Sequence, residues 1–278
     1  MYDLNETYPT RLLRRAGLLR QETAVGAGAQ LLLLALVGAM TGLGPAGWLA
    51  GLVFTAGTWA VLTRALSRAW PGPFGPANGV TLARATLVGA VTALVADSFT
   101  HRAPVALLVA LTTVALILDA VDGQVARRTG SVSSLGARFD MEVDAFLILV
   151  LSAYVALSLG PWVLLIGAMR YVFVVAARVL PWLNGALPPS MARKTVAALQ
   201  GIALLVASAG FLPHLPALAV VLTALALLTW SFARDIAWLW RSGRDRRTAA
   251  ATPPAAVPRA LAGTRDAGPA GCAVRQSS

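Results

Sequence analysis

The feature that most constrains this chain is a series of apolar runs, each about 20 residues long, that recurs between Gln30 and Trp240. A helix of that length, with a rise of about 1.5 Å per residue, spans a hydrocarbon core of about 30 Å. Turns rich in proline and glycine, such as GLGPAG and PGPFGPANG, separate the runs. The pattern predicts an all-α polytopic membrane protein.

We expect eight spans, at residues 26–44, 47–66, 79–97, 103–126, 137–158, 162–181, 195–212 and 215–238. The loops on one side of the membrane then carry most of the cations: Arg64, Arg68, Arg127, Arg128, Arg138, Arg193, Lys194 and Arg241. The loops on the other side carry little beyond His101, Arg102 and His214. Because Lys and Arg concentrate in cytoplasmic loops, both termini are predicted to be cytoplasmic. The same rule accounts for the net charge of +11, which therefore does not indicate a nucleic-acid partner.

The two ends of the chain differ from the apolar middle. Residues 1–24 are polar and basic and predict a cytoplasmic N-terminal segment. A cleaved signal peptide is the competing interpretation, which the length of the charged region and its acidic residues disfavour. Residues 242–278 are rich in Ala, Pro, Gly, Thr and Arg and predict a disordered cytoplasmic tail.

Four aspartates stand close together between residues 118 and 146: Asp119, Asp122, Asp140 and Asp144. The first two are three residues apart and the last two are four apart, so each pair shares one face of a helix. Two spans joined by a short loop are antiparallel neighbours, so all four carboxylates are predicted to meet near the cytoplasmic interface. Each buried Asp costs about 2.5–3.5 kcal/mol on insertion scales, and something must compensate for that cost. Clusters of oxygen ligands suit Mg²⁺ or Mn²⁺, and two such ions would balance four carboxylates.

With its small residues, this stretch reads Asp119-x2-Asp122-Gly123-x2-Ala126-Arg127-x8-Gly136-x3-Asp140-x3-Asp144. It resembles the signature of the CDP-alcohol phosphatidyltransferase family at every fixed position and in both gaps. The resemblance covers the six expected spans between about residue 76 and residue 240. It implies a six-helix catalytic core over residues 68–241, with two extra transmembrane helices before it over residues 25–67.

The resemblance implies an enzyme of phospholipid biosynthesis in the cell membrane. Such an enzyme transfers a phosphatidyl group from CDP-diacylglycerol to a small alcohol and releases CMP. By similarity, Asp119, Asp122, Asp140 and Asp144 hold two Mg²⁺ or Mn²⁺ ions, and Asp144 is also the general base. The residues that would bind the CDP-lipid are Asn78, Thr81, Gly123, Ala126, Arg127 and Gly136. The resemblance also implies a homodimer. We expect it in a bacterial inner membrane, with its active site facing the cytoplasm.

A second stretch, PANGVTLARATL, supports the resemblance through Asn78-x2-Thr81-x2-Arg84, which is similar to the family's motif at the start of its first core span. Taken without the aspartate motif, Asn78 reads as a helix N-cap and Arg84 as an interfacial side chain that snorkels to the membrane surface.

The acceptor is less constrained than the donor. The stretch SMARKTVAALQ resembles the corresponding region of phosphatidylglycerophosphate synthases, so Arg193 and Lys194 are candidate ligands for an acceptor phosphate. Anchoring of the span by positive charge explains this pair equally well. Arg170 lies in the middle of an expected span, where it must face the active-site cavity or pair with a structural partner. Glycerol 3-phosphate is the first expected acceptor and inositol phosphate the second, with serine and other alcohols still open.

Three further carboxylates and two other functions complete the set of expectations. Asp97 and Asp235 lie at span ends and are expected to be solvated, and Glu142 is expected on a different face from Asp140 and Asp144. A divalent-cation transporter that uses the aspartates remains an alternative, although their place near one interface argues against conduction. A non-catalytic scaffold is the third possibility.

Overall fold

A computed structural model of the chain describes residues 8–68, 76–129, 134–185, 187–188 and 190–251. At several helix ends it describes the backbone and not the side chains, namely at residues 8–23, 65–68, 76–78, 122–129, 134–135 and 244–251. All structural statements below refer to these residues.

The described residues form eight α-helices and two short 3-10 helices, and they contain no strand. In chain order the elements are α1 (Tyr8–Thr41), α2 (Pro45–Arg68), α3 (Pro76–Asp97), α4 (Val105–Thr129), α5 (Ser134–Leu159), η1 (Pro161–Val163), α6 (Leu164–Val179), η2 (Pro181–Asn184), α7 (Met191–Ser208) and α8 (His214–Ala251). Each of the eight expected spans overlaps one of these α-helices. The predicted all-α fold is confirmed.

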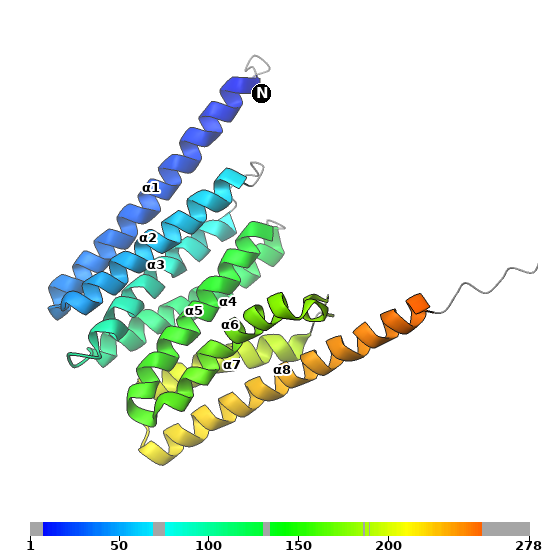
Figure 1. Ribbon diagram of the computed structural model, residues 1–278. Helices are drawn as coiled ribbons and strands as arrows, with labels where there is room; N and C mark the ends of the chain where they lie inside the picture. The colour runs from blue at the N-terminus through cyan, green and yellow to red at the C-terminus, as the bar shows by residue number, and fades with distance from the viewer. Residues whose placement is uncertain (1–7, 69–75, 130–133, 186, 189, 252–278) are drawn as a thin grey trace, which may run out of the picture.

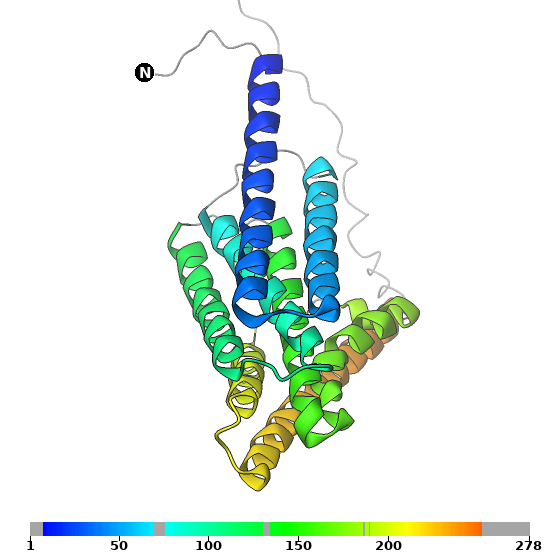
Figure 2. The same cartoon turned by 90° about the vertical axis from the view of Figure 1, so that its left-hand side faces the viewer.

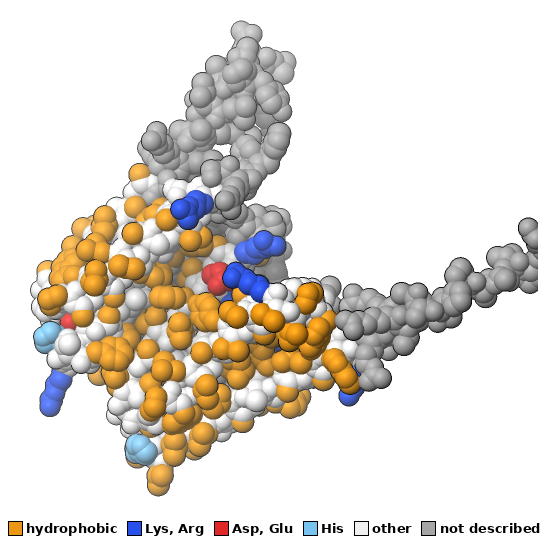
Figure 3. Space-filling model, in the orientation of Figure 1, with side chains coloured by type: hydrophobic (Ala, Val, Ile, Leu, Met, Phe, Trp, Pro, Cys, Tyr) orange, Lys and Arg blue, Asp and Glu red, His pale blue; other side chains and the backbone are white. Residues whose placement is uncertain are grey.

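Six of the helices are long and apolar enough to cross a membrane: α1, α2, α3, α5, α6 with the preceding η1, and α8. In α4 the apolar stretch is shorter and covers Val105–Val121. The first turn of α7 carries Arg193 and Lys194. Large apolar side chains such as Leu32 and Leu36 are exposed. Apolar side chains cover much of the visible surface in Figure 3, where lipid would contact them. The chain is therefore a polytopic membrane protein, while the number of eight spans stays a prediction.

Helix α3 lies at the centre of the N-terminal part of the bundle. It packs against α1, α2, α4 and α5, whereas α1 lies at one outer edge and α8 at the other (Figure 1). Its buried face is built from Ala and Val with few larger side chains, for example Ala85, Val88, Val91 and Ala93. Small side chains allow helix backbones to approach closely, which is the usual basis of helix association in membranes. The position of α3 matters for function because it carries Arg84.

Helices α1 and α2 form a hairpin that packs onto α3 (Figure 2). On α2, a Cβ atom at Gly47 would lie 2.9 Å from the carbonyl oxygen of Ala93, so the two backbones nearly touch. Further along α2, the ring of Phe54 lies 5.0 Å from that of Phe146 on α5. The hairpin therefore contacts both α3 and α5.

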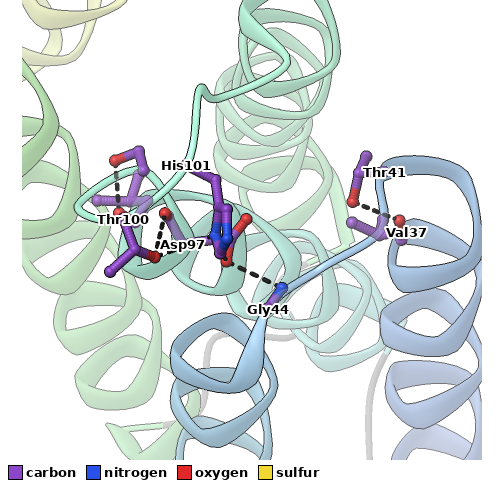
Figure 4. A network of polar contacts seen from close by, with 8 residues as sticks. Val37, Thr41, Gly44, Asp97, Thr100 and His101 are labelled. Atoms are coloured by element: carbon purple, nitrogen blue, oxygen red, sulfur yellow. Dashed lines mark hydrogen bonds and ion pairs between the residues drawn. The ribbon is translucent and has the colours of Figure 1, made fainter.

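The loops at one end of the bundle are joined by Asp97, the last residue of α3 (Figure 4). Its carboxylate accepts a hydrogen bond of 2.9 Å from the backbone N–H of Gly44, in the turn between α1 and α2, and lies 3.1 Å from the imidazole Nδ1 of His101. The residue is only 7% exposed, so the expectation that Asp97 is solvated is wrong. A backbone donor at the start of α2 is available to bind the carboxylate, and burial follows from that contact.

The helices at the two ends of the chain extend beyond the expected spans. Helix α1 begins at Tyr8, so most of the basic N-terminal segment is helical. Helix α8 continues to Ala251, which corrects the expectation that residues 242–251 belong to a disordered tail. Arg and Ala are strong helix formers and extend a helix that the preceding span has already nucleated. The rest of the predicted tail, residues 252–278, lies outside the described residues.

Candidate active site

Three carboxylates from two neighbouring helices converge within the bundle. Asp119 comes from α4, and Asp140 and Asp144 come from successive turns of α5. One carboxylate oxygen of each residue can be chosen so that all three lie within 4.8 Å of one another. The structure thus brings together three of the four aspartates that the sequence places on facing helices. Asp122 lies one turn after Asp119 on α4, and its side chain is outside the described residues.

Arg84 of α3 lies between these carboxylates. Its Nη1 pairs with Oδ1 of Asp119 and its Nη2 with Oδ1 of Asp140, while Nη2 is 3.0 Å from Oδ1 of Asp144. The same Nη2 also donates to the backbone carbonyl of Asp140 at 3.3 Å. One guanidinium therefore ties α3 to both α4 and α5.

Arg84 is much more deeply buried than the three carboxylates that it contacts. The side chain of Arg84 is 1% exposed, whereas the side chains of Asp119, Asp140 and Asp144 are 42%, 35% and 43% exposed. The guanidinium approaches the cluster from the protein interior, and the carboxylates keep an open side. In Figure 3, acidic and basic side chains meet at the edge of the apolar surface. A charged ligand can therefore reach the carboxylates from outside.

The donor set fits a hard divalent cation. The three side chains offer only oxygen atoms, they stand on helices, and their net charge stays negative after Arg84 is counted. Oxygen ligands of this kind suit Mg²⁺ and Mn²⁺ and disfavour metals that prefer sulfur or imidazole.

Comparison with known families identifies the family of the chain. The family model for CDP-alcohol phosphatidyltransferase matches residues 75–232, more than half of the chain. The chain belongs to this family. It is therefore a transferase of substituted phosphate groups that acts on a CDP-alcohol and an alcohol acceptor, in a family that uses a divalent metal. Neither the search among curated proteins nor the search among solved structures found a match.

The matched residues of the transferase begin directly before α3 and include all three converging aspartates. Helices α1 and α2 lie outside the match. Membership of a transferase family also removes the support for the cation-transporter alternative.

Two of the residues expected to bind the CDP-lipid can be placed in the transferase. Thr81 is buried on α3, one turn before Arg84, and Gly136 lies in the first turn of α5, one turn before Asp140. Both therefore stand next to the carboxylate cluster along their helices. The side chains of the other four are outside the described residues, although their backbones belong to α3 or α4: Asn78, Gly123, Ala126 and Arg127.

Arg84 is a site residue of the transferase to which the sequence pattern assigned no role in the site. The snorkelling interpretation is wrong, because the side chain points inward and is almost completely enclosed. A signal was present in the sequence: a cation inside an apolar span needs a partner, and the aspartate motif supplies the nearest negative charge. That reasoning, which pointed to a partner for Arg170, holds for Arg84 as well.

Arg170 of α6 has a structural partner and also lies near the site. Its Nη2 donates to Oε1 of Glu142 at 2.6 Å, and Glu142 stands two residues before Asp144 on α5. Its Nε is buried and makes no hydrogen bond within the described part of the chain. The structural partner expected for Arg170 is therefore present, while a place facing the active-site cavity stays a prediction.

The second basic group of the transferase joins α7 to α8. Nη1 of Arg193 lies 3.3 Å from Oδ2 of Asp235, and Nη2 of Arg193 donates to the carbonyl of Pro188 at 2.8 Å. Arg234 also contacts Asp235, at 3.3 Å. Because the side chain of Asp235 is only 14% exposed and paired with two arginines, the expectation that it is solvated is wrong. Lys194 is exposed.

Proposed function

We propose that this enzyme moves a phosphatidyl group from CDP-diacylglycerol to a small alcohol and releases CMP. The observation that carries the proposal is the convergence of Asp119, Asp140 and Asp144 inside the family-matched helices, with one open side. A diphosphate is highly charged, and a site for it needs charge neutralisation at a place that the head group of a lipid can reach.

In the proposed site, Asp119, Asp122, Asp140 and Asp144 hold two ions of Mg²⁺ or Mn²⁺. The ions supply charge neutralisation at the diphosphate. Support comes from the all-oxygen donor set and from the family's use of a divalent metal. The spacing of Asp119 and Asp122, one turn apart on α4, supports including Asp122 in this set.

The proposed reaction is a single displacement at the phosphorus that carries the diacylglycerol. The hydroxyl oxygen of the acceptor forms a bond to this phosphorus. The bond from the phosphorus to the bridging oxygen of the diphosphate breaks, and its electron pair leaves with CMP. Asp144 accepts the hydroxyl proton, which is the role of a general base. Its side chain, which is 43% exposed and therefore accessible to an acceptor, supports this assignment.

The CDP portion is proposed to lie along α3, α4 and the start of α5. Thr81 and Asn78 offer polar side chains on α3, and Arg127 offers a cation for the diphosphate. Gly123, Ala126 and Gly136 leave room for the nucleotide, because small residues let a ligand approach the backbone. The placement of Thr81 and Gly136 beside the carboxylates supports this arrangement.

The acceptor is proposed to be glycerol 3-phosphate, with inositol phosphate as the second choice. Arg170 is the best-supported ligand for an acceptor phosphate, because its partner Glu142 stands two residues before Asp144 on α5 and its buried Nε makes no hydrogen bond within the described residues. Arg193 is already engaged by Asp235 and Pro188, and Lys194 is exposed, so both are weaker candidates.

The enzyme is proposed to be a homodimer in a bacterial inner membrane, with its active site facing the cytoplasm. In Figure 3, a group of acidic and basic side chains lies away from the two histidines, which mark the other end of the bundle. This separation agrees with the positive-inside rule.

The experiment that tests the proposal is CMP release by the purified protein with CDP-diacylglycerol and Mn²⁺ or Mg²⁺. The acceptors are glycerol 3-phosphate, inositol phosphate, inositol and serine, each tested separately. We expect release with glycerol 3-phosphate, loss of release in EDTA, and recovery on adding back Mn²⁺. Release with serine alone would refute the proposed acceptor, and metal-independent release would refute the proposed chemistry. The variant Arg102→Gln, which removes an exposed cation from the opposite end of the bundle, is the control.

A further inference from the structure

Arg84 makes an unusual set of contacts for an arginine inside a bundle of apolar helices. Among the residues whose side chains the structure describes, its ion pairs are with the three carboxylates of the site, and in each case the contacted atom is Oδ1. Its Nε is buried and makes no hydrogen bond within the described part of the chain. The Nε–H, one of the five N–H donors of a guanidinium, therefore takes no part in holding the side chain. Arg84 is instead held by the site carboxylates and by one carbonyl of the same cluster.

The charges explain why a cation is needed there. Three carboxylates with oxygen atoms within 4.8 Å of one another repel strongly, because water is partly excluded from them. A single guanidinium that contacts all three reduces this repulsion and holds α3, α4 and α5 together. In the absence of a bound metal, Arg84 is therefore the main counter-ion of the described cluster.

The same contacts oppose metal binding. A divalent ion needs oxygen lone pairs of the carboxylates that Arg84 contacts, and it must enter a space beside a fixed positive charge. Removing that charge strengthens the attraction between the carboxylates and the ion. Loss of the guanidinium also loosens the ligands. We expect the like-charge repulsion to be the larger effect, because Arg84 and the ion would contact the same carboxylates.

We propose that Arg84 is a built-in counter-ion that competes with the divalent metal for Asp119, Asp140 and Asp144. It holds the three carboxylates together in the metal-free protein and gives up part of its contacts when an ion binds. Arg84 is thus a positioning residue that lowers the metal affinity of the site and keeps the empty site folded. This inference rests on the proposed function, because it requires that the aspartates bind the metal.

The test is the binding of Mn²⁺ to the purified full-length protein, measured by electron paramagnetic resonance of the free ion. The proteins are the wild type, Arg84→Gln, Arg84→Lys and the control Arg102→Gln. We expect Arg84→Gln to bind Mn²⁺ at least tenfold more tightly than the wild type. Arg84→Lys should fall between the two, because an ammonium is a point charge that cannot span three carboxylates. Arg102→Gln should match the wild type.

Thermal unfolding in detergent supplies a second readout. Without metal, Arg84→Gln should unfold at a lower temperature than the wild type, and Mn²⁺ should raise its midpoint by more than it raises that of the wild type. If Arg84→Gln does not fold without metal, Arg84→Lys carries the comparison on its own.

Three outcomes would overturn the inference. Equal Mn²⁺ affinity of the wild type and both Arg84 variants would remove the competition. Weaker binding in the variants would mean that Arg84 only organises the ligands. Failure of the wild type itself to bind Mn²⁺ would refute the proposed metal site, and the inference would fall with it.

Discussion

Arg84 and Arg170 are two arginines within apolar helices, and both have carboxylate partners on α5, while Arg84 also pairs with Asp119 on α4. Arg84 is enclosed by the site carboxylates, and Arg170 pairs with Glu142. A charge at the depth of a span is costly, so it marks a functional site or a structural ion pair. At the scale of single residues, the proposed roles of these charged side chains can therefore be tested by removing one charge at a time.

Asp144→Asn tests the proposed general base. The substitution keeps the size of the side chain and removes its ability to take a proton from the acceptor. We expect the rate of CMP release at saturating substrate to fall by about 10²–10⁴-fold, the range typical of general acid–base catalysis. Turnover at the wild-type rate would contradict the role of Asp144. The unfolding midpoint with Mn²⁺ bound, compared with that of Arg102→Gln, reports whether the variant is folded.

Arg170→Gln tests the proposed acceptor site. Hydrogen bonds to charged groups contribute about 1.5–3 kcal/mol, so we expect the KM for the phosphorylated acceptor to rise by about 10–100-fold. The KM for CDP-diacylglycerol should change little. Glu142→Gln is the matched variant, because it breaks the same ion pair and leaves the arginine in place. If both variants lower the unfolding midpoint equally and neither changes KM, Arg170 has a structural role only.

At the scale of elements, the positions of the site residues depend on how closely the helices approach. Helix α6 carries Arg170, and it touches α5 at Gly167, one turn earlier. A Cβ atom at Gly167 would lie 2.4 Å from Cα of Leu149, which no real contact allows. The glycine is therefore required for the distance between α5 and α6.

Gly167→Ala is expected to push α6 away from α5. Overpacking of this kind costs about 1–3 kcal/mol, so the unfolding midpoint should fall, and the acceptor KM should rise with the displacement of Arg170. Gly57→Ala on α2 is the control, because no described atom lies within 4 Å of the place that its methyl group would take. That control should be neutral or stabilising by up to about 1 kcal/mol, since Ala favours a helix more than Gly does. Equal midpoints for the two variants would contradict the close packing of α5 and α6.

At the scale of the whole molecule, the hairpin of α1 and α2 contacts the family-matched core at three separate places. Small residues bring α2 close to α3, Phe54 reaches Phe146 on α5, and Asp97 binds the turn of the hairpin. Phe146 lies two residues after Asp144, so the hairpin contacts the helix that carries the proposed base.

Asp97→Ala tests how firmly the hairpin is attached. The change removes the acceptor for the N–H of Gly44 and the partner of His101. We expect the free energy of unfolding to fall by about 1.5–3 kcal/mol, as for other hydrogen bonds to a charged group, and the midpoint in detergent to fall with it. Asp97→Asn keeps one acceptor oxygen and should lose less. An unchanged midpoint in Asp97→Ala would show that packing alone holds the hairpin.

The amino-acid sequence by itself determined which segments are helices and which faces carry the aspartates. Span length and the spacing of Asp140 and Asp144 are local properties of the sequence. In a helix, the length of an apolar run sets the thickness that it can cross, and a spacing of four residues puts two side chains on one face. The extension of α8 to Ala251 was missed because helix-forming residues and disorder-promoting residues share the same stretch.

Only the tertiary structure decided which charges meet. Arg84 is 35 residues from Asp119 and 56 from Asp140, Gly44 is 53 from Asp97, and Arg193 is 42 from Asp235. A periodic pattern tells which face of a helix is polar, but the choice of neighbour depends on how all the helices pack. For that reason the aspartate cluster was foreseen, while the arginine at its centre, the buried Asp97 and the paired Asp235 became visible only in the folded protein.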